Sequence, residues 1–209
     1  MKRLGTTLAG AMCAGVLALG FWGIASAEET AAAATPAAAA PAAHQYVGAK
    51  KCKMCHNAEK GGAQFTKWTE SKHAKALETL GSEEAKKIAA EKKIADPATS
   101  AECLSCHQTG YGVAADHLAA SFVAEGVTCE SCHGAGADYI KMKTMAGIRD
   151  KSLKAEDDGL VMPTKETCEK CHNDKSPTFK SFDFAEYSKK IEHKIPEGYK
   201  RGGATEEAK

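Results

Sequence analysis

Apolar positions recur at helical spacing in the segment that follows residue 62. His73, Leu77 and Leu80 fall on one face of such a helix. Gly81 follows at once and is a typical helix end. The pattern therefore predicts a helix over Ala63–Leu80 with His73 on its apolar face.

Three further segments have helical signals, and none alternates apolar and polar residues as a strand does. Ser82, followed by two glutamates, is typical of an N-cap. Glycines at 110 and 112 indicate a turn. We therefore expect a mainly α fold with extensive loops. The further helices are expected from Ser82 to about Ile94, over Tyr139–Ile148 and over Ala185–Ile191.

The chain begins with the layout of a secretory signal peptide. Lys2 and Arg3 precede an apolar run over Leu8–Ile24, and Ala25-Ser26-Ala27 forms a small-residue cleavage site. A retained membrane anchor is the alternative, but the run is marginal in length for spanning. We expect cleavage after residue 27, an Ala/Pro-rich tether over 28–45, a folded domain over 46–199 and a disordered polar tail over 200–209.

Four copies of the pattern Cys-x-x-Cys-His carry the chemistry of this chain. This pattern is the attachment signature of c-type haem, in which two thiols bond to the porphyrin and the histidine ligates iron. The repeats predict four covalently attached haem c groups. The attaching cysteines are Cys52, Cys55, Cys103, Cys106, Cys129, Cys132, Cys168 and Cys171, and the proximal ligands are His56, His107, His133 and His172.

Zinc ribbons and disulfides are the alternatives for paired cysteines. Two Cys-x-x-Cys pairs can form one Cys₄ zinc site, and an exported chain can form disulfides. Neither alternative explains why a histidine follows every second cysteine. Lysines and arginines number 28 against 27 acidic residues, a formal net charge of +1. This balance gives no indication of a nucleic-acid partner.

The second axial ligands must come from outside the motifs. His73 and His193 are the first candidates, because each lies among apolar residues. His117 follows a glycine-rich turn and either ligates or caps a loop. His44 lies on the tether, where we expect a solvated side chain. Met142 and Met145 are further candidates, although their spacing also fits ordinary packing.

The chain resembles the tetrahaem cytochrome c-554 family. The resemblance rests on GAKKCKMCH, FTKWTESKHAKALETL, ECLSCHQTGYG, EGVTCESCHGAG and the final motif with SPTF and KKIEHK. It implies a compact helical fold with closely packed haems, three of them bis-histidine. By position it implies His73 as ligand to the third haem, His193 to the fourth, and an open second haem on His107.

One departure from the family pattern concerns the first haem. The family places a histidine shortly after the third motif, and GAGADYIKMKTMAGIRD contains none. The first haem then uses His44, His117, Met142 or Met145, or stays open. His117 could equally be the second axial ligand of the second haem, which would then have no open position.

The sequence therefore predicts an electron-transfer protein of the periplasm, with an extracellular location left open. Its partners would be a redox donor and a redox acceptor, with no nucleic acid and no stable membrane insertion after cleavage. One alternative is a haem enzyme that reduces a small nitrogen oxide at an open haem. Another is a polymerising cytochrome in which the tether with His44 reaches a neighbouring copy.

Overall fold

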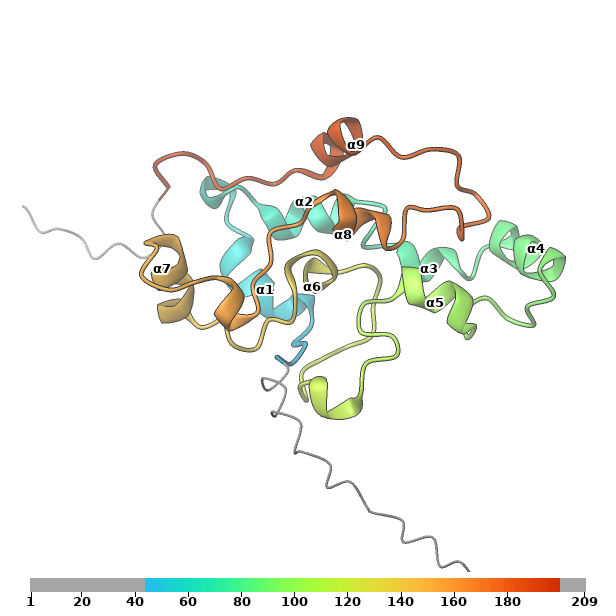
Figure 1. The fold of residues 1–209 in the computed structure, drawn as a ribbon, viewed down its shortest axis with the longest axis horizontal. Coiled ribbons are helices and arrows are strands. Elements are labelled where there is room, and N and C mark those ends of the chain that lie inside the picture. The colour runs from blue at the N-terminus through green and yellow to red at the C-terminus, as the bar shows by residue number, and fades with distance from the viewer. Residues whose placement is uncertain (1–43, 200–209) are drawn as a thin grey trace, which may run out of the picture. The chain divides into compact units, whose positions relative to one another are not determined.

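The computed structural model describes residues 44–199, which belong to one compact unit (Figure 1). The predicted signal peptide, the tether up to residue 43 and the polar tail lie outside the described residues. Within them, no helix combines the length and apolar character needed to cross a membrane.

Short helices joined by loops make up the described chain, as predicted. An isolated bridge between Tyr46 and Leu118 is the β-pairing found in residues 44–199. Three 3₁₀ turns cover Glu59–Gly61, Ala115–His117 and Glu156–Asp158. The α-helices are α1 (Ala49–His56), α2 (Gln64–Glu70), α3 (Ala76–Thr79), α4 (Glu83–Glu91), α5 (Ala101–His107), α6 (Cys129–His133), α7 (Met142–Arg149), α8 (Lys165–Glu169) and α9 (Phe184–Ile191).

Three predicted helices are present at nearly the predicted positions. The Ser82 hydroxyl caps α4 by accepting a hydrogen bond from the Ala85 backbone N–H at 3.1 Å. Helix α9 is capped in the same way by Asp183. Helix α7 begins three residues later than the apolar pattern indicated, at Met142.

The single helix expected over Ala63–Leu80 is wrong, because the chain breaks between α2 and α3. Ser71 adopts extended backbone angles, and its hydroxyl donates to the Trp68 carbonyl at 2.7 Å. The His73 carbonyl then accepts a hydrogen bond from Val127 N–H at 2.9 Å. The same carbonyl also accepts from the Ala76 N–H at 3.1 Å, so this segment forms a turn that pairs with the segment before α6 instead of a continuous helix.

The haem motifs lie on short helices, which puts both cysteines of each pair on one face. The first three motifs lie inside α1, α5 and α6. In the fourth, α8 includes Cys168, while Cys171 and His172 follow in a turn. Residues three apart on a helix are neighbours, so each pair of thiols can reach one porphyrin.

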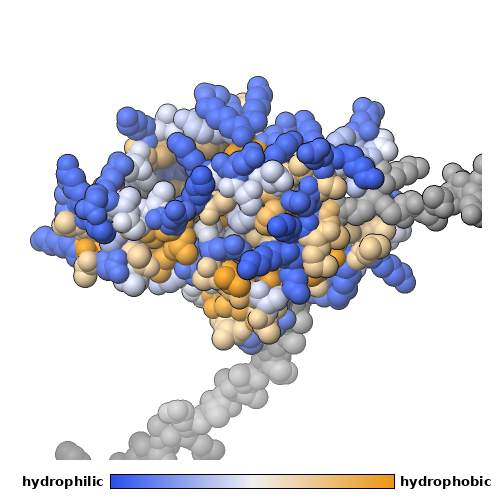
Figure 2. Space-filling model, turned by 180° about the vertical axis from the view of Figure 1, so that it is seen from behind, coloured by the Kyte–Doolittle hydropathy of each residue, from blue (hydrophilic) through white to orange (hydrophobic). Residues whose placement is uncertain are grey.

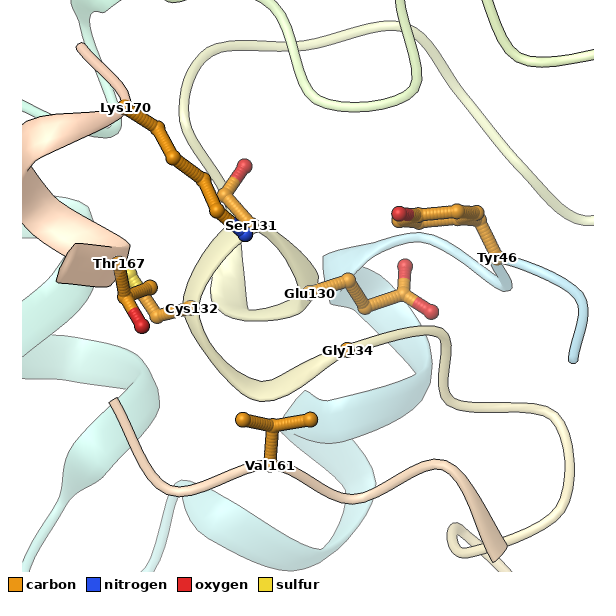
Figure 3. A pocket seen from close by; sticks show the side chains of 8 residues that line it. All are labelled: Tyr46, Glu130, Ser131, Cys132, Gly134, Val161, Thr167 and Lys170. Carbon is orange, nitrogen blue, oxygen red and sulfur yellow. The ribbon is translucent and has the colours of Figure 1, made fainter. Parts of the chain in front are cut away.

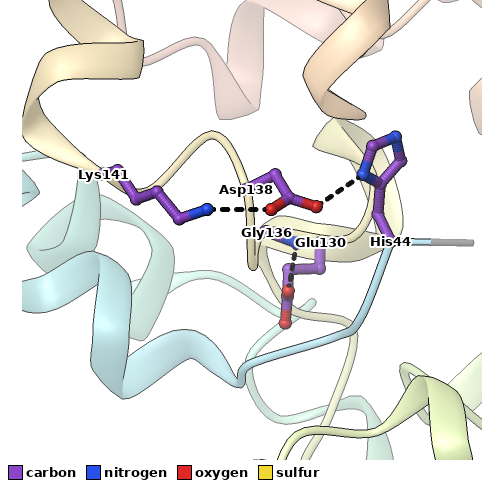
Figure 4. Close-up of polar contacts among 5 residues, drawn as sticks. All are labelled: His44, Glu130, Gly136, Asp138 and Lys141. Carbon is purple, nitrogen blue, oxygen red and sulfur yellow. Dashed lines mark hydrogen bonds and ion pairs between the residues drawn. The ribbon is translucent and has the colours of Figure 1, made fainter. Parts of the chain in front are cut away.

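A buried carboxylate joins the third motif to the segment before the first (Figure 4). The side chain of Glu130, in α6, is 1% exposed. It accepts backbone N–H bonds from Val47 at 2.9 Å, Gly48 at 2.8 Å and Gly136 at 2.7 Å. Three donors from two segments thereby satisfy a charge that would otherwise be costly to bury.

The apolar core of the described residues is small. Its buried members are Val47, Ala49, Leu80, Ala89, Leu104 and Tyr139. Hydrophobic side chains also form small exposed patches between hydrophilic ones (Figure 2). Hydrogen bonds such as those of Glu130 therefore do much to hold the described segments in their positions.

We expect Glu130→Gln to lower the free energy of unfolding by about 2–3 kcal/mol. The amide keeps one acceptor oxygen but turns an NH₂ group toward a backbone N–H, which leaves buried donors without an acceptor. Urea unfolding of the haem-loaded protein, followed by circular dichroism, measures this change.

The matched control is Glu102→Gln, because the Glu102 side chain is exposed on α5. This control should change the free energy of unfolding by no more than about 0.5 kcal/mol. Equal losses in the two variants would contradict the role assigned to Glu130.

Candidate haem sites

The rings of three candidate ligands are held by backbone carbonyls at Nδ1. His107 Nδ1 lies 2.7 Å from the Ala76 carbonyl, and His133 Nδ1 lies 3.1 Å from that of Val161. His193 Nδ1 lies 2.7 Å from the Ile191 carbonyl. A carbonyl only accepts, so Nδ1 must carry the proton. The lone pair of each neutral ring is then on Nε2, the nitrogen left for a metal.

His73 lies opposite the proximal histidine of the fourth motif. The ring centres of His73 and His172 are 5.9 Å apart, with an angle of 79° between the ring planes. Burial, and secondarily the charge of His172, lower the pKa of His73. Burial also lowers the pKa of His172. Both rings therefore favour the neutral form that ligates metal.

A second imidazole pair forms at the third motif. The ring centres of His133 and His193 are 6.0 Å apart, with the planes at 74°. Burial is the largest cause that lowers the pKa of His133, and His193 adds to it. The C-terminal segment after α9 thus supplies the partner ring of the third motif.

These pairings are the reverse of those implied by resemblance. His73 was expected at the third haem and His193 at the fourth, but the structure places His73 beside His172 and His193 beside His133. The break between α2 and α3 explains part of the difference, because it redirects the backbone at His73. A continuous helix would give that ring a different direction.

In each pair two imidazoles lie close together, with ring centres 5.9 and 6.0 Å apart. Imidazole is a common ligand of haem iron. The residues present at the third and fourth motifs could therefore hold a haem iron through two histidines each.

Contacts between cysteines of different motifs place the four motifs in a row. The Cys52 thiol hydrogen-bonds Cys129, and this contact is the main cause that raises the pKa of Cys52. Burial, followed by the charge of Cys168, raises the pKa of Cys132. The first motif thus adjoins the third, which approaches the fourth.

The row continues from the fourth motif to the second. Burial, followed by the nearby Cys106, raises the pKa of Cys171 to about 12. Helices α1 and α6 also pack together, as do α3 and α5. These contacts link the first motif to the third, the third to the fourth and the fourth to the second.

The remaining candidate ligands belong to neither of these imidazole pairs. The His117 side chain is 41% exposed, with Nε2 4.0 Å from an Asp116 oxygen. Met142 is 74% exposed at the start of α7, and Met145 is half-buried on the same helix. In the described chain the His107 ring is bonded to the Ala76 carbonyl and to none of these three side chains.

His44 is anchored rather than solvated, which corrects the expectation for it (Figure 4). Its Nδ1 lies 2.8 Å from Asp138 Oδ2, and Lys141 Nζ lies 3.0 Å from the other carboxylate oxygen. The neighbouring Gln45 side chain donates to the Asp116 carbonyl at 2.6 Å. Residues 44 and 45 of the predicted tether therefore pack on the folded unit.

A small polar cavity lies between the third and fourth motifs (Figure 3). Its volume is about 110 Å³, and its lining includes Ser131, Cys132, Thr167 and Lys170. Pockets for drug-sized ligands are about 300–1,000 Å³. The cavity is therefore of a size for a few water molecules, not for a porphyrin.

The structure also reveals residues that sequence reasoning missed. Phe182 stacks on His172 with ring centres 4.8 Å apart and planes at 18°. No sequence signal identified Phe182, because its contact joins separate loops. No sequence signal identified Glu130 either, because a glutamate stands at the same place in the fourth motif, Glu169, and its side chain is 42% exposed.

The alternatives of zinc and disulfides find no support in the described residues. All eight motif cysteines are free thiols there. No cluster of three or more Cys, His, Asp or Glu side chains in residues 44–199 is placed to hold a metal ion. A Cys₄ site would require such a cluster.

Comparison with known proteins connects these motifs to one family. A family described as cytochrome c554 and c-prime matches residues 51–134, which include the first three motifs. Cytochrome c-554 of Nitrosomonas europaea is 35% identical over 132 residues, covering 60% of this chain and 51% of that protein. The chain thus spans about half the length of that relative.

A solved structure, reduced cytochrome c554 from the same organism, is also similar. It is 26% identical, with a TM-score of 0.47, and the match covers 71% of this chain and 79% of that chain. The family match covers the segment with α6 and its CESCHG motif. Residues 51–134 are therefore similar to the family described as cytochrome c554 and c-prime.

Proposed function

We propose that this protein is a periplasmic tetrahaem cytochrome that carries electrons between redox partners. The observation that carries the proposal is the set of four neighbouring motifs, in which two of the motif histidines each lie beside a second imidazole. A haem c bound at each motif would supply an iron that takes up and releases one electron.

The side chains of this protein have separate tasks in that function. The cysteine pairs hold each haem covalently, and the backbone carbonyls of Ala76 and Val161 fix the tautomers of His107 and His133. Bis-imidazole sites at the third and fourth motifs favour electron transfer, because neither axial position is left for a substrate. Because neighbouring motifs lie close together, the haems bound at them would be separated by short electron-transfer distances.

Export is supported by the sequence of residues 1–27. Those residues have the order of a secretory signal, and the attachment of c-type haem fits a chain that is exported. Redox proteins are therefore the partners we propose, with one donor and one acceptor.

A haem enzyme is a second candidate, and the surroundings of His107 favour it. The His107 ring is held at Nδ1 by Ala76, and in the described residues no histidine outside the motifs has a ring contact with it. An open axial position there would accept a small ligand such as nitric oxide. Electron paramagnetic resonance that shows only low-spin, six-coordinate iron in the wild-type protein would exclude this candidate.

The mass of the secreted protein tests the cofactor count. When the chain is expressed with a haem-attachment system, we expect the mass of residues 28–209 plus four haem groups, because every cysteine pair is intact. Each Cys→Ala pair, such as Cys103→Ala with Cys106→Ala, should remove one haem. A mass with fewer haems in the wild-type protein would refute the count.

His73→Gly should convert one haem from six-coordinate low-spin to five-coordinate, because it removes the ring opposite His172. Added imidazole should restore the low-spin spectrum. The control is His117→Gly, which removes an imidazole that belongs to neither pair and should leave the spectrum unchanged. Electron paramagnetic resonance and carbon monoxide binding measure the change.

The same variant tests which motif His73 serves. In a protein without the fourth haem (Cys168→Ala with Cys171→Ala), His73→Gly should have no further effect. In a protein without the third haem (Cys129→Ala with Cys132→Ala), His73→Gly should still convert one iron from six-coordinate to five-coordinate. The opposite result would favour the pairing implied by resemblance over the pairing in the structure.

A further inference from the structure

Positive charge is concentrated around the first motif. Residues 49–75 contain seven lysines and two glutamates, whereas residues 97–137 contain four acidic residues and no lysine or arginine. The chain as a whole carries a formal net charge of +1. We call the four of these side chains that lie on α1 and α2 the lysine surface: Lys50, Lys51, Lys53 and Lys67.

The side chains of the lysine surface are all exposed and make no ion pair with a carboxylate in residues 44–199. Helices α1 and α2, which carry all four of them, pack against each other. Lys53 Nζ of α1 lies 5.5 Å from the centre of the Phe65 ring of α2. Their positive charges therefore add over one pair of packed helices instead of being neutralised within the chain.

An exposed methionine lies among these lysines beside the attachment cysteines. Met54 is 80% exposed, follows Lys53 directly and precedes Cys55. Protein interfaces commonly have an apolar centre in which methionine is enriched, surrounded by a polar rim. Met54 and the lysine surface have this composition at one end of the row of motifs.

We propose that the lysine surface with Met54 is the docking site for an acidic surface of a redox protein. The inference rests on the proposed electron-transfer function and assigns the first motif as the end of the row where that partner binds. These four cations would attract a negatively charged partner over a Debye length of about 8–10 Å and raise the association rate. Met54 would then be covered by apolar surface of the partner.

An anionic membrane is the other surface that lysines attract. A membrane-binding helix, however, presents a broad apolar face below its lysines. Helix α1 has its buried residue, Ala49, at the N-terminus and its exposed apolar residue, Met54, alone among lysines. The local composition therefore favours an acidic protein.

The test compares two triple variants with equal charge changes. Lys50→Glu, Lys51→Glu and Lys67→Glu reverse charges on α1 and α2, outside the attachment motif itself. The control, Lys86→Glu, Lys87→Glu and Lys92→Glu, reverses three exposed charges at α4, which lies away from α1 in Figure 1. Stopped-flow reduction of the haem-loaded proteins by reduced flavodoxin, a small acidic donor, gives the second-order rate constant.

We expect the rate constant of the wild-type protein to fall steeply with salt, and the α1–α2 variant to be slower by about tenfold or more at low salt. The α4 variant should stay within about twofold of the wild-type protein. Equal slowing of both variants, or a wild-type rate that does not depend on salt, would overturn the docking site. A second result would overturn the docking site in favour of a membrane. In that result the lysines are needed to bind phosphatidylserine vesicles, while the flavodoxin rate constant is unchanged in the variants.

Failure of the electron-transfer function has a different signature. Dithionite, a small reductant that needs no docking site, should reduce the haems in all three proteins. Haems that dithionite does not reduce would contradict the proposed function itself. Haems that dithionite reduces, with no effect of Lys50, Lys51 and Lys67 on the flavodoxin rate, would contradict the docking site alone.

Discussion

The buried carboxylate of Glu130 is the constraint on which the arrangement of the haem motifs depends. Its two oxygens accept N–H bonds from Val47, Gly48 and Gly136, so that one side chain joins the start of α1 to α6 and to the loop after it. With few apolar side chains buried in residues 44–199, these directional bonds hold the first and third motifs side by side. The contact of Cys52 with Cys129 follows from that junction.

From this junction the other motifs extend as a row with different surroundings. The third and fourth motifs each gain a second imidazole, from the segment after α9 and from the break between α2 and α3. His107 is anchored by a carbonyl of α3 instead. The two close imidazole pairs support the proposed electron-transfer function, and the lysine surface on α1 and α2 is the docking site proposed for a partner.

Sequence reasoning succeeded where the signal is local. The cap of Ser82 and the span of α9 follow from residues within a few positions of each other, and both are confirmed. It failed at His73, where the Val127 N–H competes for a backbone carbonyl that a continuous helix would have used. It also misjudged His44, because Asp138, the residue that binds it, is remote in the chain.

The sequence by itself determined the cofactor chemistry and the helical class, since Cys-x-x-Cys-His spacing and helix caps act over one or two turns. It named His73 and His193 as candidates, because each is placed among apolar neighbours. Only the tertiary structure decided that His73 faces His172 and His193 faces His133. Such pairings depend on loop paths and on long-range hydrogen bonds, which no local spacing encodes.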